Sequence, residues 1–165
     1  MTPVSEQLKL AALDTSDLEV IAAHLQDAVM LIGDMRFDPK AGNIIFLLNR
    51  FDWSHGGDDS QPYRRRQTAL QFDRVRRVRS RKIRMDAKMA VLSLLNIAFE
   101  QNDAPSGLVR LVFSGGGEIE LDVECIEARL SDTGPEWETA SKPDHDDQDR
   151  VDGAMATIPD AAMKD

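Results

Sequence analysis

Segment 54–62 contains the residue types of a hydrolase triad close together in the chain: Ser54, His55, Asp58 and Asp59. Nucleophilic catalysis requires a histidine that contacts the serine on one side and the acid on the other. Side chains from one short, glycine-containing loop cannot adopt that arrangement, so we expect no triad here. His55, Asp58 and Asp59 are also metal-ligand types, but a solvated loop is the favoured interpretation.

Neither the single cysteine nor the run of three glycines shows a catalytic pattern. Cys125 lies between Glu124 and Glu127, whose negative charges disfavour the reactive thiolate. We therefore expect a buried structural thiol. The glycine run 115–117 is not followed by the Lys-Ser or Lys-Thr pair of a phosphate-binding loop, so it predicts a hairpin turn.

Two other polar patterns also favour structural roles. His24 precedes Asp27 by three residues, a spacing typical of a hydrogen bond near the end of a helix. The run 144–147, Asp-His-Asp-Asp, lacks the glycine and the terminal glutamate of a calcium-binding loop. We therefore predict no catalytic residue, no metal ligand and no cofactor.

The segment Asn49-Arg50-Phe51-Asp52-Trp53 concentrates two aromatic and three hydrogen-bonding side chains at the end of an expected strand. The favoured interpretation is a core edge, with Phe51 and Trp53 inward and Arg50 paired with Asp52 outside. The alternative is a ligand or peptide groove lined by Asn49, Arg50, Asp52 and Trp53.

Positive charge is concentrated in one segment of an acidic chain. Residues 64–88 contain nine Arg and two Lys against two Asp, a net of +9, whereas the whole chain carries −9 and the rest of it therefore −18. Charges segregated this strongly predict an electrostatic contact surface. The candidate partner-binding residues are Arg64, Arg65, Arg66, Arg74, Arg76, Arg77, Arg79 and Arg81.

The apolar residues of this segment predict a strand with β-bulges. They alternate as far as Phe72, whereas Val75 and Val78 are three positions apart. One extra residue at 73–74 and another at 76–77 restores a single apolar face. The opposite, solvent-facing side then carries Arg74, Arg76, Arg77, Arg79 and Arg81.

Several roles fit such a face. The arginines can form surface ion pairs with the acidic residues at 118–124 or with the C-terminal tail, which is a structural role. Our leading functional prediction is a non-enzymatic interaction module that binds an acidic protein partner through the arginine-rich strand face. The alternatives are an RNA- or DNA-binding protein autoinhibited by its acidic tail, and a small-ligand binder or enzyme with a site near residues 49–53. Overall acidity and the scarcity of aromatic residues that could stack on bases count against nucleic acid.

Apolar spacing predicts the elements that position these residues. Ser16 and Glu19 have the spacing of a capping box, and the apolar stripe after them predicts a helix over 17–27. Strands are expected over 29–37, 44–53, from near 68, over 91–99, and in a hairpin over 108–123.

The hairpin has the clearest pattern. Val109, Leu111 and Phe113 alternate before the glycine run, and Ile119, Leu121 and Val123 alternate after it. Strict alternation predicts one buried and one solvent-facing side. Beyond Cys125, apolar residues four positions apart predict a short helix that ends near residue 131.

Composition sets the remaining bounds. Of the 41 Leu, Ile, Val and Phe residues among 165, only two lie in the last 34 positions, so we predict one α+β domain over 1–138 and an acidic disordered tail over 139–165. No uncharged apolar run approaches the ~20 residues that a bilayer span needs. A single cysteine and the absence of a signal-peptide pattern favour a cytoplasmic protein.

The chain resembles a bacterial family of uncharacterised proteins, domain-of-unknown-function family 2948. The resemblance rests on short motifs spread over residues 8–137: 8–10, 24–28, 48–53, 65–75 and 123–135. It implies one bacterial, cytoplasmic domain and carries no catalytic residue or cofactor with it. The fold we expect is an antiparallel sheet of about six strands with an N-terminal and a short C-terminal helix, arranged as a half-barrel or roll similar to the pleckstrin-homology architecture.

Overall fold

Ten antiparallel strands and one α-helix make up the part of the chain that the computed structural model describes, residues 7–52 and 63–139. The strands form one open sheet in the order β1-β10-β5-β4-β2-β7-β8-β9-β6, and β3 pairs with β4 beside this path. The antiparallel sheet with an N-terminal helix is confirmed, whereas the prediction of six strands is wrong. The half-barrel or pleckstrin-homology-like arrangement stays a prediction.

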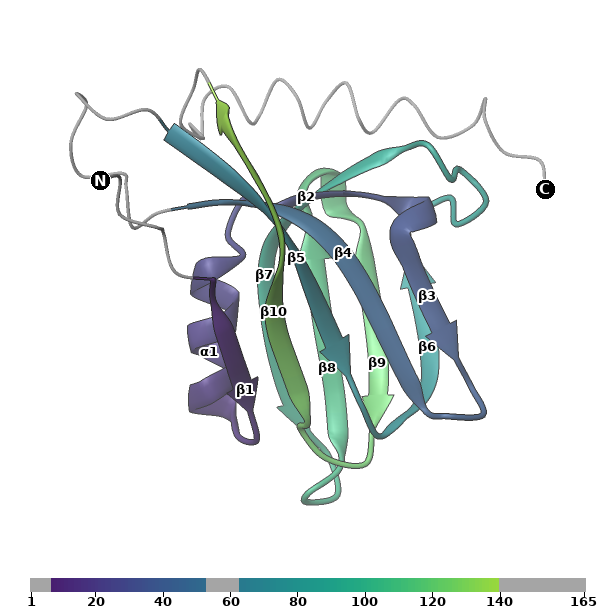
Figure 1. Ribbon diagram of the computed structural model, residues 1–165. Coiled ribbons are helices and arrows are strands. Elements are labelled where there is room, and N and C mark those ends of the chain that lie inside the picture. The colour runs from purple at the N-terminus through teal and green to yellow at the C-terminus, as the bar shows by residue number, and fades with distance from the viewer. Residues whose placement is uncertain (1–6, 53–62, 140–165) are drawn as a thin grey trace.

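The elements follow one another along the chain as Figure 1 shows. The first half contains β1 (Lys9–Ala12), α1 (Thr15–His24), β2 (Val29–Leu31), the 3-10 turn η1 (Ile32–Asp34), β3 (Met35–Asp38) and β4 (Asn43–Phe51). The second half contains β5 (Tyr63–Phe72), β6 (Val75–Arg81), β7 (Val91–Gln101), β8 (Gly107–Phe113), the 3-10 turn η3 (Ser114–Gly116), β9 (Glu118–Val123) and β10 (Ala128–Thr139).

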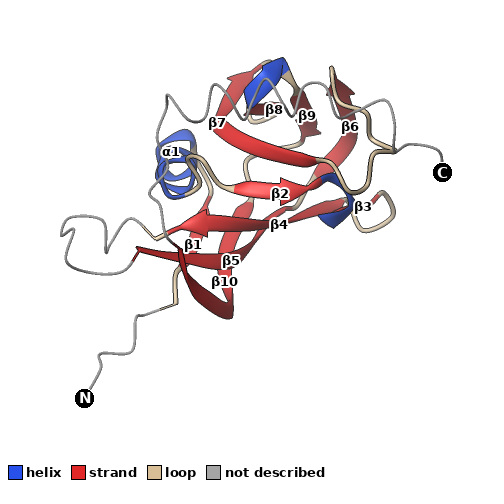
Figure 2. Cartoon of the chain, turned by 90° about the horizontal axis from the view of Figure 1, so that it is seen from above, coloured by secondary structure: helices blue, strands red, loops and turns tan. Residues whose placement is uncertain are grey.

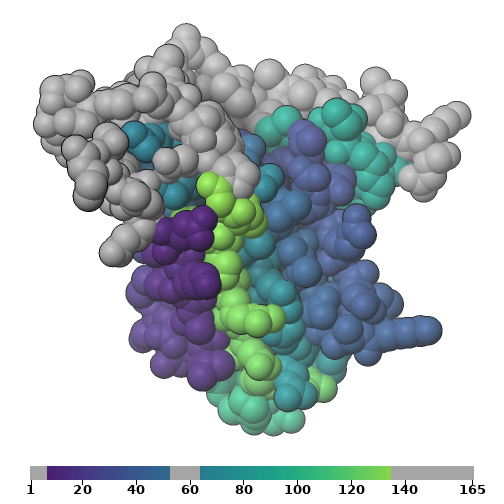
Figure 3. All heavy atoms as spheres, viewed as in Figure 1, coloured from purple at the N-terminus to yellow at the C-terminus, as the bar shows by residue number. Residues whose placement is uncertain are grey.

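The sheet folds into two layers that enclose the core. In the view of Figure 2, β7, β8, β9 and β6 lie above β1, β10, β5 and β4, and the short strand β2 joins the layers by pairing with both β4 and β7. Figure 3 shows the outer face of the lower layer, with β1, β10, β5 and β4 side by side. The core between the layers includes the edge-to-face pair Phe46 and Phe72, whose ring centroids are 6.5 Å apart.

Helix α1 contacts β1 and β7. Its apolar residues Leu18 and Ile21 are buried, as the spacing predicted. The predicted capping box is wrong, because the helix begins two residues earlier, at Thr15, and its N-cap is Asp14. The Asp14 carboxylate accepts a hydrogen bond of 2.8 Å from the backbone N–H of Asp17, the bond that a capping aspartate provides.

Two predicted elements have a different structure. The strand expected over 29–37 is interrupted by η1, which separates β2 from β3. The C-terminal helix expected after Cys125 is a strand, β10, which lies between β1 and β5. The apolar residues Ala128 and Leu130 are buried at a spacing of two. Buried side chains therefore alternate as in a strand and do not follow the helical spacing that the sequence predicts.

The hairpin prediction is confirmed. β8 and β9 pair through the glycine turn, and Val109, Leu111, Ile119, Leu121 and Val123 are all buried, between 0% and 1% exposed. Within the described ranges, no helix combines the length and the apolar character needed to cross a bilayer.

Candidate functional site

The arginine segment forms two strands with different neighbours. β5 ends at Phe72, Arg74 adopts the left-handed backbone conformation (φ +60°), and β6 begins at Val75. β5 pairs with β4 and β10, whereas β6 pairs with β9. The predicted bulge at 76–77 is present as a register shift between Val75 and Arg77, but the expected bulge at 73–74 is a turn between strands. Three of the eight candidate arginines therefore lie on β5 and four on β6. Arg74, in the turn between the two strands, forms an exposed ion pair of 3.2 Å with Glu127.

One group lies on β6, at an edge of the sheet. We call it the arginine edge: Arg76, Arg77, Arg79 and Arg81. All four residues are exposed, whereas Val75 is buried and Val78 half-buried against the core. The solvent-facing arginine side that the spacing predicted is thus present on this strand.

Carboxylates of β9 lie opposite the arginine edge. In the register of the two strands, Arg77, Arg79 and Arg81 face Asp122, Glu120 and Glu118. Arg76 forms an ion pair of 3.0 Å with Asp122, Arg81 one of 3.7 Å with Glu118, and Arg79 hydrogen-bonds Glu120. The acidic side of the hairpin strand therefore offsets much of the positive charge of β6.

Arg110 of β8 adds a cation on the far side of β9. It lies 3.6 Å from Glu118 and 3.3 Å from Glu120, and donates a 2.8 Å hydrogen bond to Glu100. The bond to Glu100 and the nearby carboxylates raise the pKa of Arg110 above its usual value. The outer face of β6, β9 and β8 is therefore an alternation of charges rather than a uniformly basic stripe.

Arg77 differs from its neighbours. It is exposed, and within residues 7–52 and 63–139 no ion pair to its guanidinium is present. Ser80 lies across from the fully buried Ile119, yet it is itself exposed. The inner side of β6 is therefore open to solvent at Ser80, where the core layer ends.

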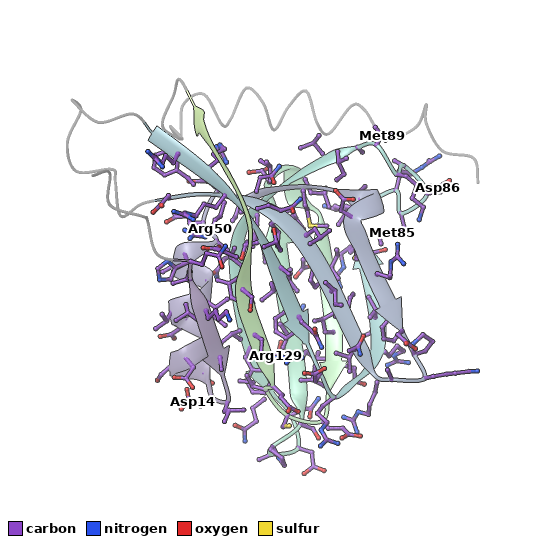
Figure 4. All side chains as sticks on the ribbon, in the orientation of Figure 1. Asp14, Arg50, Met85, Asp86, Met89 and Arg129 are labelled. Carbon is purple, nitrogen blue, oxygen red and sulfur yellow. The ribbon has the colours of Figure 1, made fainter. Side chains whose placement is uncertain are left out.

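The other group lies in a buried charge cluster where β4 ends and β5 begins. Its best-defined contact joins Arg50 of β4 to Asp132 of β10, in a two-pronged pair with Nε–Oδ1 and Nη2–Oδ2 distances of 2.9 and 2.8 Å. The two side chains are 5% and 1% exposed. Asp132 also accepts a 2.7 Å hydrogen bond from the backbone N–H of Leu8, so the pair ties the start of the chain to the sheet. Arg50 is labelled in Figure 4.

A second pair belongs to the same cluster. Arg66 of β5 donates a 3.0 Å hydrogen bond to Asp52, and both residues are buried. Arg65 hydrogen-bonds the carbonyl oxygen of Asn49 at 3.4 Å. Burial lowers the pKa of Arg65, and the negative charge of Asp27 opposes that shift. Arg64, Arg65 and Arg66 are therefore not part of the arginine edge.

The expected pairing of Arg50 with Asp52 on the solvent side is wrong. Both side chains are buried and each has a partner from another strand. Arg50 continues the inward side of β4 after Ile44, Phe46 and Leu48, so the alternation of the strand brings a charge to the inner face. The groove predicted from Asn49, Arg50, Asp52 and Trp53 stays a prediction, and Trp53 lies outside the described residues.

His24, at the end of α1, lies close to this cluster. Burial lowers its pKa, and the positive charge of Arg50 lowers it further, against the opposing effects of Asp132 and Asp52. The structure therefore favours a neutral imidazole. The hydrogen bond between His24 and Asp27 that the sequence predicts stays a prediction.

The lowered pKa of His24 predicts a pH-dependent stability. The unfolded chain binds a proton at His24 near pH 6.5 and the folded chain only at lower pH, so the free energy of unfolding is expected to fall as the pH drops below about 6.5. His24→Gln should flatten this part of the profile. Denaturant unfolding between pH 8 and 5.5, approximately the range where a histidine titrates, measures the effect. His145→Gln is the control, and an equal flattening by both substitutions would contradict the assignment.

The other residue patterns have these outcomes. The prediction of a turn at the glycine run is confirmed. The prediction of a buried thiol at Cys125 is wrong, because this residue, which follows the end of β9, is half-buried and free. The residues of the triad-like loop, the Asp-His-Asp-Asp run and nearly all of the acidic tail lie outside the described residues. Within the part that is described, no group of three or more His, Cys, Asp or Glu side chains could hold a metal ion.

Sequence reasoning missed the main partner in the buried cluster, Asp132. The residue follows Ala128 and Leu130 at a spacing of two and therefore occupies an inward position. Reading 128–132 as a strand would have placed a carboxylate in the core, where it requires a cationic partner. The identity of that partner depends on how β10 lies between β1 and β5.

Comparison with known proteins identifies a family and nothing more specific. The model of the family described as "Protein of unknown function (DUF2948)" matches residues 8–145. No curated protein and no solved structure matches the chain.

Proposed function

We propose a function for this chain, which belongs to the DUF2948 family of proteins of unknown function. Its own geometry favours a non-enzymatic interaction domain that binds an acidic segment of a protein partner along β6. The observation that carries this proposal is the position of β6 at the end of the sheet. In the described chain its only strand neighbour is β9. The N–H of Val75 at the start of β6 already donates to the carbonyl oxygen of Gly42. Beyond Val75, an edge strand presents backbone N–H and C=O groups that an extended peptide can pair with, by adding one more strand.

The arginine edge supplies the charge that would select an acidic segment. Arg76, Arg79 and Arg81 are 49%, 56% and 67% exposed at their side chains although they have carboxylate partners. Ion pairs this exposed contribute about 0–1 kcal/mol each, so an incoming carboxylate can replace the partner at little cost. Arg77 has no ion pair to give up among the described residues.

The same geometry favours a peptide over a nucleic acid. The phosphates of RNA or DNA lying across the face would approach Glu118, Glu120 and Asp122 as closely as the arginines. A strand added to the outer side of β6 has the arginines between itself and those carboxylates. The autoinhibited nucleic-acid binder therefore stays the second prediction.

The proposal predicts specific binding of an extended acidic peptide. A labelled peptide of alternating glutamate and threonine should bind the full-length chain, and Arg77→Glu with Arg79→Glu should weaken binding at least about tenfold, since a lost charge-assisted hydrogen bond is worth about 1.5–3 kcal/mol. Fluorescence anisotropy at several salt concentrations measures the affinity. The same peptide with alternate backbone amides N-methylated should bind much less, because it cannot form the strand ladder.

Lys9→Glu with Arg129→Glu is the matched control, because both residues are exposed and lie on β1 and β10, at the other edge of the sheet. This variant has the same net charge and should keep most of the affinity. Equal weakening in the two variants would mean that only overall charge matters. Absence of binding would leave the arginines as protection of the edge against unwanted strand pairing, a known role of charged edge residues.

A further inference from the structure

A hollow of about 210 Å³ lies at one end of the molecule, away from the buried charge cluster. Its walls come from four segments: η1, the connection 82–90 between β6 and β7, the first two residues of β7, and the turn 114–117. The connection carries Met85, Asp86 and Met89, which Figure 4 labels at the upper right. Since a water molecule occupies about 30 Å³ in the liquid, the hollow has room for a small metabolite.

One wall of the hollow is apolar. Ile32, Ala87 and Ala90 form a small core of their own, against which Ile83 packs, and all four line the hollow. This cluster is separate from the main core between the two layers.

The lining also includes basic residues. Lys82 and Arg84 line the hollow, and none of the described residues that line it carries a carboxylate. Arg84 lies 4.0 Å from Asp86, whereas no ion pair to Lys82 is present among the described residues. Lys82 also has a left-handed backbone (φ +58°), an uncommon conformation for a residue other than glycine and one that recurs at functional sites.

The glycine turn completes the site. Ser114 is 8% exposed, and its hydroxyl group has no hydrogen-bond partner among the described residues. A buried polar group without a partner is rare in folded proteins and requires an explanation such as a ligand or bound water. A Cβ atom at Gly117 would lie 2.7 Å from a side-chain carbon of Ile83, so the turn requires glycine to approach the connection this closely.

We propose that this hollow binds a small organic anion with an apolar body, such as a short branched carboxylate. The half-buried apolar residues Ile83, Val91 and Leu92 take the hydrocarbon part, and Lys82 neutralises the carboxylate. Inorganic phosphate fits less well, because half of the wall offers it no donor. A neutral molecule of the same shape leaves Lys82 without a counter-charge. The site is independent of the proposed peptide-binding edge, since none of these residues belongs to Arg76–Arg81.

Titration of the full-length, ¹⁵N-labelled chain tests the proposal. The probes are 4-methylpentanoate, the neutral 4-methylpentanamide of the same shape, and inorganic phosphate. We expect the carboxylate to give saturable amide shifts at Ile32, Lys82, Ala87 and Gly117, with an affinity at least about tenfold higher than that of either other probe, the ratio that corresponds to 1.4 kcal/mol.

Two variants and a control locate the site. Lys82→Asn removes the charge while keeping a residue that tolerates a left-handed backbone, and it should weaken carboxylate binding at least about fivefold, on the scale of one lost charge-assisted contact. Ala90→Leu should fill the hollow and abolish the shifts. Lys88→Asn, an exposed residue of the same connection that does not line the hollow, should leave binding unchanged. The proposal is overturned if the carboxylate gives no saturable shifts at tens of millimolar, or if Lys82→Asn and Lys88→Asn have the same effect.

Discussion

Arg50→Met is expected to destabilise the folded chain by about 3–5 kcal/mol, the usual result of removing one partner from a buried ion pair. The substitution keeps much of the side-chain volume but leaves the carboxylate of Asp132 buried, at 1% exposure, without its two hydrogen bonds from the guanidinium. Denaturant unfolding monitored by circular dichroism at neutral pH measures the change. Binding of the acidic peptide should be unaffected in the folded fraction, because Arg50 is far from β6 in the sheet order.

A second substitution separates the ion pair from simple loss of packing. Asp132→Asn in the Arg50→Met background removes the uncompensated charge, while the amide oxygen can still accept from the N–H of Leu8. We expect the double variant to recover about 1–3 kcal/mol, the penalty of a buried unpaired group. If the double variant is less stable than Arg50→Met alone, the carboxylate is stabilised by something other than Arg50.

The pKa of Asp132 makes the contribution of its ion pair with Arg50 to stability depend on pH. Burial by itself raises this pKa, but the hydrogen bonds from Arg50 and Leu8 outweigh burial and lower it below the usual value. A carboxyl group with a lowered pKa stabilises the fold above its unfolded pKa and loses that contribution as the pH falls through the folded value. In the Arg50→Met variant burial acts without the guanidinium, so the destabilisation should be smaller in acid than at neutral pH.

Leu121→Asp is expected to destabilise the chain by several kcal/mol, about the cost of burying an unpaired charge. Leu121 of β9 is 0% exposed and belongs to the main core. A variant that does not fold at all agrees with the expectation. Leu121→Ala then gives the measurable value, about 2–5 kcal/mol for a leucine truncated in a core.

The adjacent residue provides the control. Glu120 faces outward on the same strand and contacts Arg79 and Arg110. Glu120→Gln keeps the side-chain shape and removes the charge, so it should change the free energy of unfolding by less than about 1 kcal/mol. Equal losses at both positions would contradict the assignment of buried and exposed sides.

The local pattern determined the elements whose two sides differ clearly. The hairpin of β8 and β9 alternates strictly, and the structure has it where the pattern predicts. The arginine segment likewise showed its bulge at 76–77 and its exposed arginines. These features can be predicted from residues close together in the sequence, because the alternation of side chains along a strand is enough to separate inward from outward positions.

Only the tertiary structure decided which arginines share a surface and which charges are buried. Arg66 and Arg79 come from one basic segment, but the chain turns at Arg74, so Arg66 lies on the interior strand β5 and Arg79 on the edge strand β6. Arg50 and Asp132 are 82 positions apart, and nothing local indicates that two charged residues will meet inside the core. β10 inserts between β1 and β5, and that long-range pairing places the carboxylate against the guanidinium. The alternation of side chains along a strand predicts which side of the sheet a residue occupies. The residue that neutralises a buried charge depends on the order of the strands in the sheet, and no local sequence pattern contains that order.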